Sequence, residues 1–269
     1  MRITFIGGGN MASALIGGIL DRTASTGIAV VDPVASQREL LAQRFGVATH
    51  AAPVPAALDC DVLVMAIKPQ QMREAALAIA PHIGRQLVVS VAAGIRAGDL
   101  SRWLGGHQRI VRCMPNTPAL VGAGITGLAA MPGLPDDDRA IAESLLAAVG
   151  QTLWVDEESM LDAVTAVSGS GPAYVFYFME AIEAAAVRMG FDAEQARTLT
   201  LATFMGAAKL AAQSPEPASV LRERVTSKGG TTAAALDVMA RRDLPSHIAD
   251  ALQAACARSV ELGDEFGRD

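Results

Sequence analysis

The chain has 269 residues, half of them apolar but only 4% aromatic, with 22 basic against 28 acidic side chains. This length allows one large domain or two ordinary ones, each with its own core, and two is the better expectation. The mildly acidic balance, without any run of like charges that would follow a phosphate backbone, argues against nucleic acid as a partner. Three distant cysteines, an odd number, fit reduced thiols in the cytoplasm rather than a disulfide framework. Four scattered histidines offer no metal-ligand spacing, so no metal site is expected.

The first element is a short apolar strand within an uncharged run that extends from Ile3 to Leu20. Such a run resembles a secretory signal or a membrane anchor. The sequence GGGN at residues 7–10 splits it into a strand and a helical piece, each too short for either role. A second uncharged run, 113–135, is interrupted by four prolines. We therefore expect no membrane span.

Residues 1 to about 158 alternate short apolar runs with segments of helical period. Seven runs are typical of strands: RITFIG, IAVVD, DVLVMAIK, QLVVSVAA, RIVRCM, GITGLAAM and TLWVD. Helical periodicity separates several of them, as in SQRELLAQRF and DDRAIAESLLAAV. The alternation predicts βαβ units and a mainly parallel sheet. We expect an α/β fold in which residues 1–158 form a doubly wound, Rossmann-type dinucleotide-binding domain.

The strand pattern stops near Leu161, and helical segments continue from there to the end of the chain. One of them begins at Asp192, with Gln195 three residues later, which predicts a capping box with Asp in place of Ser or Thr. The segment AYVFYFM, residues 173–179, leaves little polar face over two turns. A domain of about 110 residues cannot easily bury such a segment alone. We expect residues 159–269 to form an all-α domain that makes a homodimer.

A glycine motif follows the first strand. Gly7, Gly9 and Ala12 fit the pattern G-x-G-x-x-A at the junction of a strand and a helix. Glycines there allow a tight turn and the close approach of a pyrophosphate, which the amides of the helix then bind. In this context dinucleotide binding is a better interpretation than a structural glycine turn. The expected contacts are Gly7, Gly8, Gly9, Asn10, Met11 and Ala12.

Asp32 ends the second strand, at the distance from the glycines where a carboxylate binds the ribose hydroxyls of NAD and repels the extra phosphate of NADP. That position favours NAD. The alternative is that Asp32 and Pro33 only form a turn, while Ser36 and Arg38 hold a phosphate. The sequence leaves both readings open, so the cofactor is NADP(H) or NAD(H).

Two further strand ends carry polar residues. Lys68 and Pro69 follow the strand DVLVMAIK, at the edge where nucleotides bind in doubly wound sheets, so Ala66, Ile67 and Lys68 would pass beside the cofactor. A lysine there can equally be a solvated surface residue. Asn116 and its neighbour Thr117 lie between two prolines in a rigid turn, which on its own can be structural.

Two segments of the helical half, SGSGPAY (168–174) and VTSKGGTT (225–232), place Ser, Thr and Gly before a helix. Helix amino termini present free amides and partial positive charge, which suit a carboxylate. Neither glycine-rich turn supplies a histidine, aspartate or glutamate as a base, which the oxidation of an alcohol requires. A protonated imine needs no strong acid when it accepts hydride, so the motifs favour reduction of a C=N bond in a small acid.

Together, AVSGSGPAYVFYFMEAI, VTSKGGTT, MPNTP and AIKPQ, in their order along the chain, resemble pyrroline-5-carboxylate reductases over nearly the whole sequence. The resemblance implies NAD(P)H-dependent reduction of 1-pyrroline-5-carboxylate to L-proline. It implies dimers through an intertwined helical domain, often assembled into a decamer of five dimers.

The resemblance also assigns site residues. It implies that the cofactor is lined by Gly7 to Ala12, Ala66 to Pro69, and Val91, Ala92, Ala93 and Gly94, with Asp32 and Asn116 as further candidates. It implies that the substrate is held by Gly229, Gly230, Thr231 and Thr232, with Ser170 and Gly171 opposite and Glu158 as a weaker contact. Thr232 is the candidate catalytic residue, at the ring nitrogen or the carboxylate.

The sequence departs from the family pattern in two places. Lys228 stands where the motif commonly has proline before GG, which adds a charge near the expected carboxylate site. The loop THAAPVPAALD lacks an asparagine that often approaches the adenosine, so cofactor preference stays open.

Three rival functions remain at this point. β-Hydroxyacid dehydrogenases share the two-domain plan but use a lysine on the first helix of the second domain, and residues 169–190 contain none. A non-catalytic NAD(P)-binding sensor would not need the two helix-start pockets. A reductase of another cyclic imino acid cannot be distinguished from the sequence.

Overall fold

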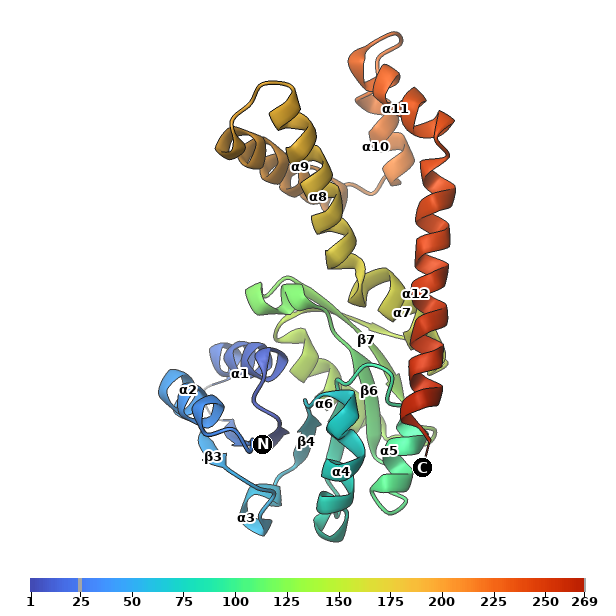
Figure 1. The fold of residues 1–269 in the computed structure, drawn as a ribbon. Coiled ribbons are helices and arrows are strands. Elements are labelled where there is room, and N and C mark those ends of the chain that lie inside the picture. Colours follow the sequence, from blue (N-terminus) through green and yellow to red (C-terminus); the bar gives the residue numbers. More distant parts are fainter. Residues whose placement is uncertain (24–25, 269) are drawn as a thin grey trace. The chain divides into compact units, whose positions relative to one another are not determined.

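The computed structural model describes residues 1–23 and 26–268. The chain forms two compact units (Figure 1). The first unit comprises Met1–Pro172 together with Ala254–Asp269, and the second comprises Ala173–Gln253.

The first unit is built on an eight-stranded sheet of order β3-β2-β1-β4-β5-β6-β7-β8. The strands are β1 Arg2–Ile6, β2 Gly27–Val31, β3 Ala48–His50, β4 Val62–Met65, β5 Leu87–Ser90, β6 Ile110–Met114, β7 Gly124–Ala130 and β8 Gly150–Trp154. Strands β3 to β6 in this order are all parallel, β7 is antiparallel to β6, and β8 is parallel to β7. The predicted Rossmann-type fold is confirmed.

One strand escaped the sequence analysis. β3 has only three residues, Ala48–His50, and pairs with β2 from Ala29 to Val31. A run of three residues is too short to show strand alternation, so only its partner reveals it.

Helices cover both faces of this sheet (Figure 1). In chain order they are α1 Asn10–Arg22, α2 Ala35–Phe45, α3 Pro55–Leu58, α4 Pro69–Ile79, the short 3-10 helix η1 Ala80–His82, α5 Ala97–Trp103, the 3-10 helix η2 Thr117–Val121, α6 Asp136–Ala147, α7 Met160–Val164 and the π-helical turn η3 Thr165–Gly169.

The core is therefore two layers, one on each side of the sheet. Along β4, Val62 and Val64 face a cluster shared with α1, α2 and α6, whereas Leu63 and Met65 face a cluster shared with α4 and α5. Helices exclude water from both faces of the sheet. Parallel strands such as β4 are therefore apolar at every position instead of alternating between apolar and polar residues.

The second unit contains the helical segments that follow. They are α8 Gly171–Arg188, α9 Ala193–Gln213, α10 Ala218–Arg224, α11 Thr231–Arg241 and α12 Leu244–Phe266, whose last part from Ala254 packs with the first unit. The capping box at the start of α9 is confirmed, because Gln195 N–H donates to Asp192 Oδ1 at 2.8 Å and Asp192 N–H donates to Gln195 Oε1 at 3.1 Å. Over residues 1–23 and 26–268, no helix combines the length and the apolar character that a membrane crossing needs.

Candidate functional site

The glycine loop after β1 is packed tightly on one side and open on the other. A Cβ built on Gly7, whose φ is +98°, would lie 2.5 Å from the carbonyl oxygen of Ala66, so only glycine fits there. A Cβ on Gly8 would lie 2.8 Å from Leu41 Cδ1. Gly9, in contrast, has nothing within 4 Å on its Cβ side. The loop is held in place and presents open space where α1 begins.

That open side has the chemistry of an anion site. Gly9 is the N-cap of α1 and makes no side-chain capping bond, and the first turn of the helix has no acidic residue. The first amides of a helix lack intrahelical acceptors and carry partial positive charge. Gly9, Asn10 and Met11 therefore fit the pyrophosphate of a dinucleotide.

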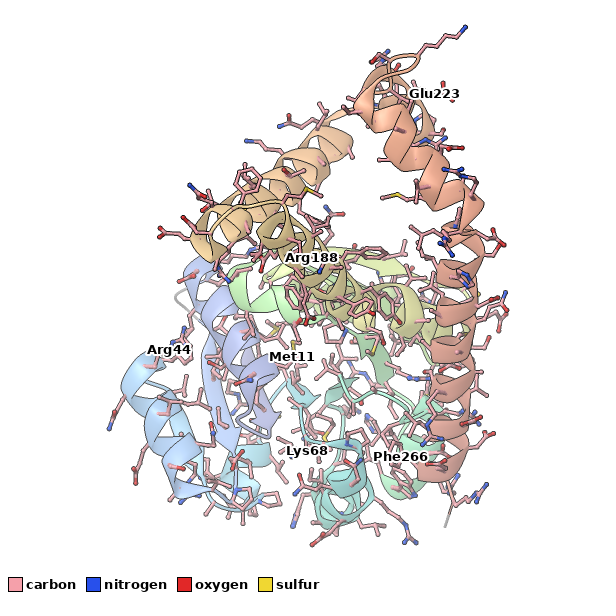
Figure 2. All side chains as sticks on the ribbon, turned by 45° about the horizontal axis from the view of Figure 1, so that its top comes forward. Met11, Arg44, Lys68, Arg188, Glu223 and Phe266 are labelled. Carbon is pink, nitrogen blue, oxygen red and sulfur yellow. The ribbon has the colours of Figure 1, made fainter. Side chains whose placement is uncertain are left out.

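The loops after β4 and β5 lie beside the glycine loop. Ala66 N–H donates to Ile6 O at 2.8 Å, and Val91 N–H donates to Met65 O at 3.1 Å, so these strand ends are neighbours at one edge of the sheet. The structure thus brings together three predicted cofactor segments, Gly7 to Ala12, Ala66 to Pro69 and Val91 to Gly94 (Figure 2 labels Met11 and Lys68).

Proline shapes the second of these loops. Lys68 is the N-cap of α4 with an extended backbone, φ −65° and ψ 144°, as expected for a residue before proline. Pro69 is the first residue of the helix, where its missing N–H costs nothing. The side chain of Lys68 is exposed.

The third loop is supported from behind by the end of α12. Gly94 has φ +74°, and a Cβ on it would lie 3.1 Å from Phe266 Cδ2 and 3.4 Å from Leu262 Cβ. Phe266 packs on the core cluster that contains Ala92 and Ile95 (Figure 2). The next residue, Arg96, forms an ion pair with Asp264 of α12 at 2.6 Å. Glycine at 94 is thus required by backbone geometry and by packing.

A cavity of about 270 Å³ lies beyond β1 and β2, against α4. It is mostly apolar, and its lining residues are Ile6, Val31, Pro33, Ala51, Ala52, Pro53, Ile67, Gln71, Glu74, Ala75, Ala78 and Ile79. The position at the strand ends and the apolar walls suit a planar base at the far end of a dinucleotide. The sequence analysis related the loop that contains residues 51–53 to the adenosine through a missing asparagine, but it assigned no contact to these residues, because alanine and proline give no polar signal.

Asn116 joins two parts of the first unit. Its Nδ2 donates to Ser168 O at 3.2 Å and its Oδ1 accepts from Ile125 N–H at 3.0 Å. The residue is 8% exposed. The side chain therefore holds the loop after β6 against the start of β7 and the π-helical turn; its predicted contact with cofactor stays a prediction.

The segment before α8 does not present all of the free amides that the sequence analysis expected of a helix start. The chain is helical through α7 and η3, and Ser170 N–H donates to Thr165 O at 2.8 Å. The amide of Ser170 is therefore not free to bind a carboxylate, and α8 begins at Gly171. The expectation of a free amide was wrong at Ser170, because glycine and serine tolerate helical dihedrals as well as loops. Gly169 is close-packed, since a Cβ there would lie 2.5 Å from Met114 Cε, whereas Gly171 has nothing within 4 Å.

Glu158 belongs to a buried polar network. Its Oε1 accepts from Ala97 N–H at 2.7 Å and from Arg112 Nη1 at 3.1 Å. Arg112 is 4% exposed and also lies 3.9 Å from Asp162, which accepts from Ser259 Oγ at 2.7 Å. The sequence analysis missed this network, although an arginine inside the apolar strand RIVRCM signals a buried partner.

The two buried cysteines, Cys60 before β4 and Cys113 in β6, are unsuited to nucleophilic chemistry. Burial raises the pKa of Cys60, and it raises the pKa of the fully enclosed Cys113 far more. Because the thiolate is the reactive form, both thiols stay protonated and inert near neutral pH.

In the second unit, the loop before α11 is a tight turn. Gly230 N–H donates to Ser227 O at 3.0 Å, and Gly229 has φ +72°. Gly230 is the N-cap of α11 with no side-chain capping bond, and Thr231 is the first helical residue. A Cβ on Gly230 would meet Ser227 Oγ and lie 3.2 Å from Ser227 O, so a side chain there requires the Ser227 hydroxyl to move. The turn brings Gly229, Gly230, Thr231 and Thr232 together at a helix start whose first amides lack intrahelical acceptors.

Comparison with known proteins adds independent findings. The family described as "Pyrroline-5-carboxylate reductase dimerisation" matches residues 158–262, and the family described as "NADP oxidoreductase coenzyme F420-dependent" matches residues 2–94. A curated protein of Pseudomonas aeruginosa, a pyrroline-5-carboxylate reductase, is 44% identical over 269 residues, covering 99% of this chain and 98% of the relative.

Solved structures agree. A pyrroline-5-carboxylate reductase from Coxiella burnetii is 39% identical with a TM-score of 0.91, covering 97% of both chains. The Plasmodium falciparum pyrroline carboxylate reductase, solved with NADP bound, is 27% identical with a TM-score of 0.86, covering 98% of both chains.

Proposed function

This chain belongs to the pyrroline-5-carboxylate reductase family, and from that membership we propose which of its residues carry the reaction. The reaction is the NAD(P)H-dependent reduction of 1-pyrroline-5-carboxylate to L-proline, the last step of proline synthesis. We propose that residues 1–158 bind the cofactor and that residues 159–269 bind the substrate and form the dimer.

The cofactor lies along the three adjacent loops at the edge of the sheet. Gly9, Asn10 and Met11 hold its pyrophosphate, and Ala66 to Pro69 and Val91 to Gly94 form the walls. When bound, the reduced nicotinamide supplies the hydride. The close packing at Gly7 and the open space at Gly9 support this placement.

The substrate is held at the start of α11. The amides of Thr231 and Thr232 and the partial positive charge of the helix suit its carboxylate, and the Thr232 hydroxyl contacts the carboxylate or the ring nitrogen. The observation that carries this proposal is the turn from Ser227 to Gly230, which leaves those amides uncapped.

Ser170 and Gly171 are further proposed substrate contacts. The Ser170 amide is already hydrogen-bonded to Thr165 O, so Ser170 contributes through its side chain. Glu158 remains a predicted contact, and since Ala97 and Arg112 engage its Oε1, Oε2 is the oxygen left for substrate.

Assembly and location complete the proposal. The chain carries the family's dimerisation domain, which supports a homodimer. We also propose that five dimers assemble into a decamer and that the protein is cytoplasmic. The three unpaired cysteines support this location, because thiols stay reduced in the cytoplasm.

The test is to follow NADPH and NADH absorbance with purified protein and 1-pyrroline-5-carboxylate. We expect oxidation of at least one cofactor, and a fall in kcat/KM of roughly 10- to 100-fold in Thr232→Ala, the range of a hydrogen bond to a charged group. Thr203→Ala is the control, since that hydroxyl bonds Leu199 O on α9. Equal kcat/KM in Thr232→Ala and wild type would remove Thr232 from the site. No oxidation of either cofactor would favour another cyclic imino acid or a non-catalytic sensor.

A further inference from the structure

The carboxylate of Asp32 accepts hydrogen bonds from the backbone. Its Oδ2 accepts from Gly8 N–H at 2.7 Å, and its Oδ1 accepts from Val34 N–H at 2.8 Å. The residue is only 8% exposed. Two amides on opposite oxygens fix the plane of the group and tie the glycine loop to the end of β2. An acid that discriminates between the two cofactors hydrogen-bonds the ribose 2′-hydroxyl, whereas the orientation of the Asp32 carboxylate is set by these two backbone amides.

Arg38 lies on α2 and is held by the backbone at the end of β2. Its Nη1 donates to Asp32 O at 2.7 Å and to Pro33 O at 2.9 Å. Both acceptors are neutral carbonyls, and among the described residues the guanidinium has no carboxylate partner within 4 Å. The guanidinium is therefore not ion-paired, and Nε and Nη2 are left as donors.

The location of that charge matters. Pro33, whose carbonyl Arg38 binds, lines the cavity of about 270 Å³ that suits the base of the dinucleotide. A guanidinium at the end of β2 is thus placed near the ribose next to that base. A 2′-phosphate gains charge-assisted, bidentate hydrogen bonds from a fixed guanidinium, whereas a 2′-hydroxyl gains little.

We propose that Arg38 makes this chain select NADP(H) over NAD(H), and that Asp32 positions the glycine loop instead of discriminating between the two. The proposal rests on the proposed function, since it concerns the cofactor of that same site. An acid at the end of the second strand ordinarily indicates NAD(H). Asp32 does not, because its carboxylate is hydrogen-bonded to backbone amides and holds the glycine loop instead.

The experiment measures equilibrium binding of NADPH, NADH and two fragments, 2′,5′-ADP and 5′-AMP, by calorimetry. Wild type should bind NADPH and 2′,5′-ADP at least about 10-fold more tightly than NADH and 5′-AMP, as a charge-assisted pair implies. Arg38→Gln should remove most of that difference while leaving NADH and 5′-AMP within about two-fold. Asp32→Asn should weaken both dinucleotides by similar factors, so that their ratio is kept.

Arg44→Gln is the matched control, because Arg44 lies on the same helix but near its far end, where it contacts Ser13. It should leave all four affinities unchanged. Wild type that prefers NADH, or an Arg38→Gln variant that loses both cofactors equally, would overturn the proposal. So would an Asp32→Asn variant that loses NADH alone, since Asp32 would then be the discriminating acid.

Failure of this proposal is separable from failure of the proposed function. Fragment binding reports on Arg38 without any turnover, whereas oxidation of either cofactor by 1-pyrroline-5-carboxylate reports on the reaction. A protein that turns over but binds 2′,5′-ADP no better than 5′-AMP refutes only the role of Arg38.

Discussion

Arg112 illustrates what one charged residue does inside an apolar strand. It pairs with Glu158 and lies near Asp162, and these carboxylates are in turn bonded to the start of α5 and to Ser259 of α12. Because removing one partner of a buried pair leaves an uncompensated charge, such networks are costly to break. Strand β6, the start of α5, α7 and the end of α12 are thereby joined around a single side chain.

At the same scale, His107 makes stability depend on pH. Burial lowers its pKa below the ordinary value of 6.5, while its Nε2 lies 2.9 Å from Gln86 O. The unfolded chain therefore takes up the proton more readily than the folded chain. The contribution to stability is present above pH 6.5 and is lost as the pH falls through the folded pKa.

Urea unfolding from pH 7.5 down to pH 5 checks this. We expect His107→Gln, which removes the titrating ring, to lose less stability than wild type over that interval. His82→Gln, at an exposed histidine, should follow wild type. Identical profiles for His107→Gln and wild type would contradict the expectation.

At the scale of elements, the turn before α11 explains why proline suits the position where this chain has Lys228. Lys228 is the second residue of the turn closed by Gly230 N–H to Ser227 O, and Gly229, with φ +72°, is the third. Among the described residues only Asp243 is a non-glycine with positive φ, so Lys228 has negative φ and the turn is of type II. Proline is well suited to this second position.

We therefore expect Lys228→Pro to stabilise the protein by about 0.4–1 kcal/mol, because proline lowers the entropy of the unfolded chain. Chemical denaturation at fixed protein concentration measures the free energy of unfolding. Lys228→Ala is the control, since it removes the same charge without adding the ring. A loss of stability in Lys228→Pro alone would show that the lysine backbone is incompatible with proline.

At the scale of the whole molecule, α8 has too much apolar surface for one chain. Phe176 is 62% exposed, Tyr177 72% and Ile182 47%, and no residue of this helix is buried. Exposed apolar surface of this extent marks an interface, which agrees with the family's dimerisation domain.

Phe176→Glu should therefore weaken the dimer. Burying such a side chain contributes about 1.5–3 kcal/mol, and a two-fold interface contains it twice, so the dissociation constant should rise by roughly 10²- to 10⁴-fold. Sedimentation velocity over a dilution series measures this. Leu153→Glu, on β8 and 52% exposed, is the matched control and should stay dimeric. A wild type that is monomeric at micromolar concentration would contradict the dimer itself.

The sequence by itself determined the architecture, because apolar runs, helical periods and the glycine motif are local patterns. Each reports how a short segment buries its apolar face, and that suffices for the α/β half, the helical half and the motifs that resemble the family. It also identified the residues that the structure brings to one edge of the sheet, since carboxyl ends of parallel strands must meet there.

Only the tertiary structure decided what those residues contact. β3 is a strand because it pairs with β2, and the backbone at 168–171 is helical because α7 and η3 continue into α8. The ion pair of Arg112 is with Glu158, which is distant in the sequence. Asp32 is the clearest case: its position along the chain favours one cofactor, but amides at Gly8 and Val34 already engage both oxygens. The sequence states which chemical groups a side chain has. Its hydrogen-bond partners depend on which residues come within bonding distance when the chain folds.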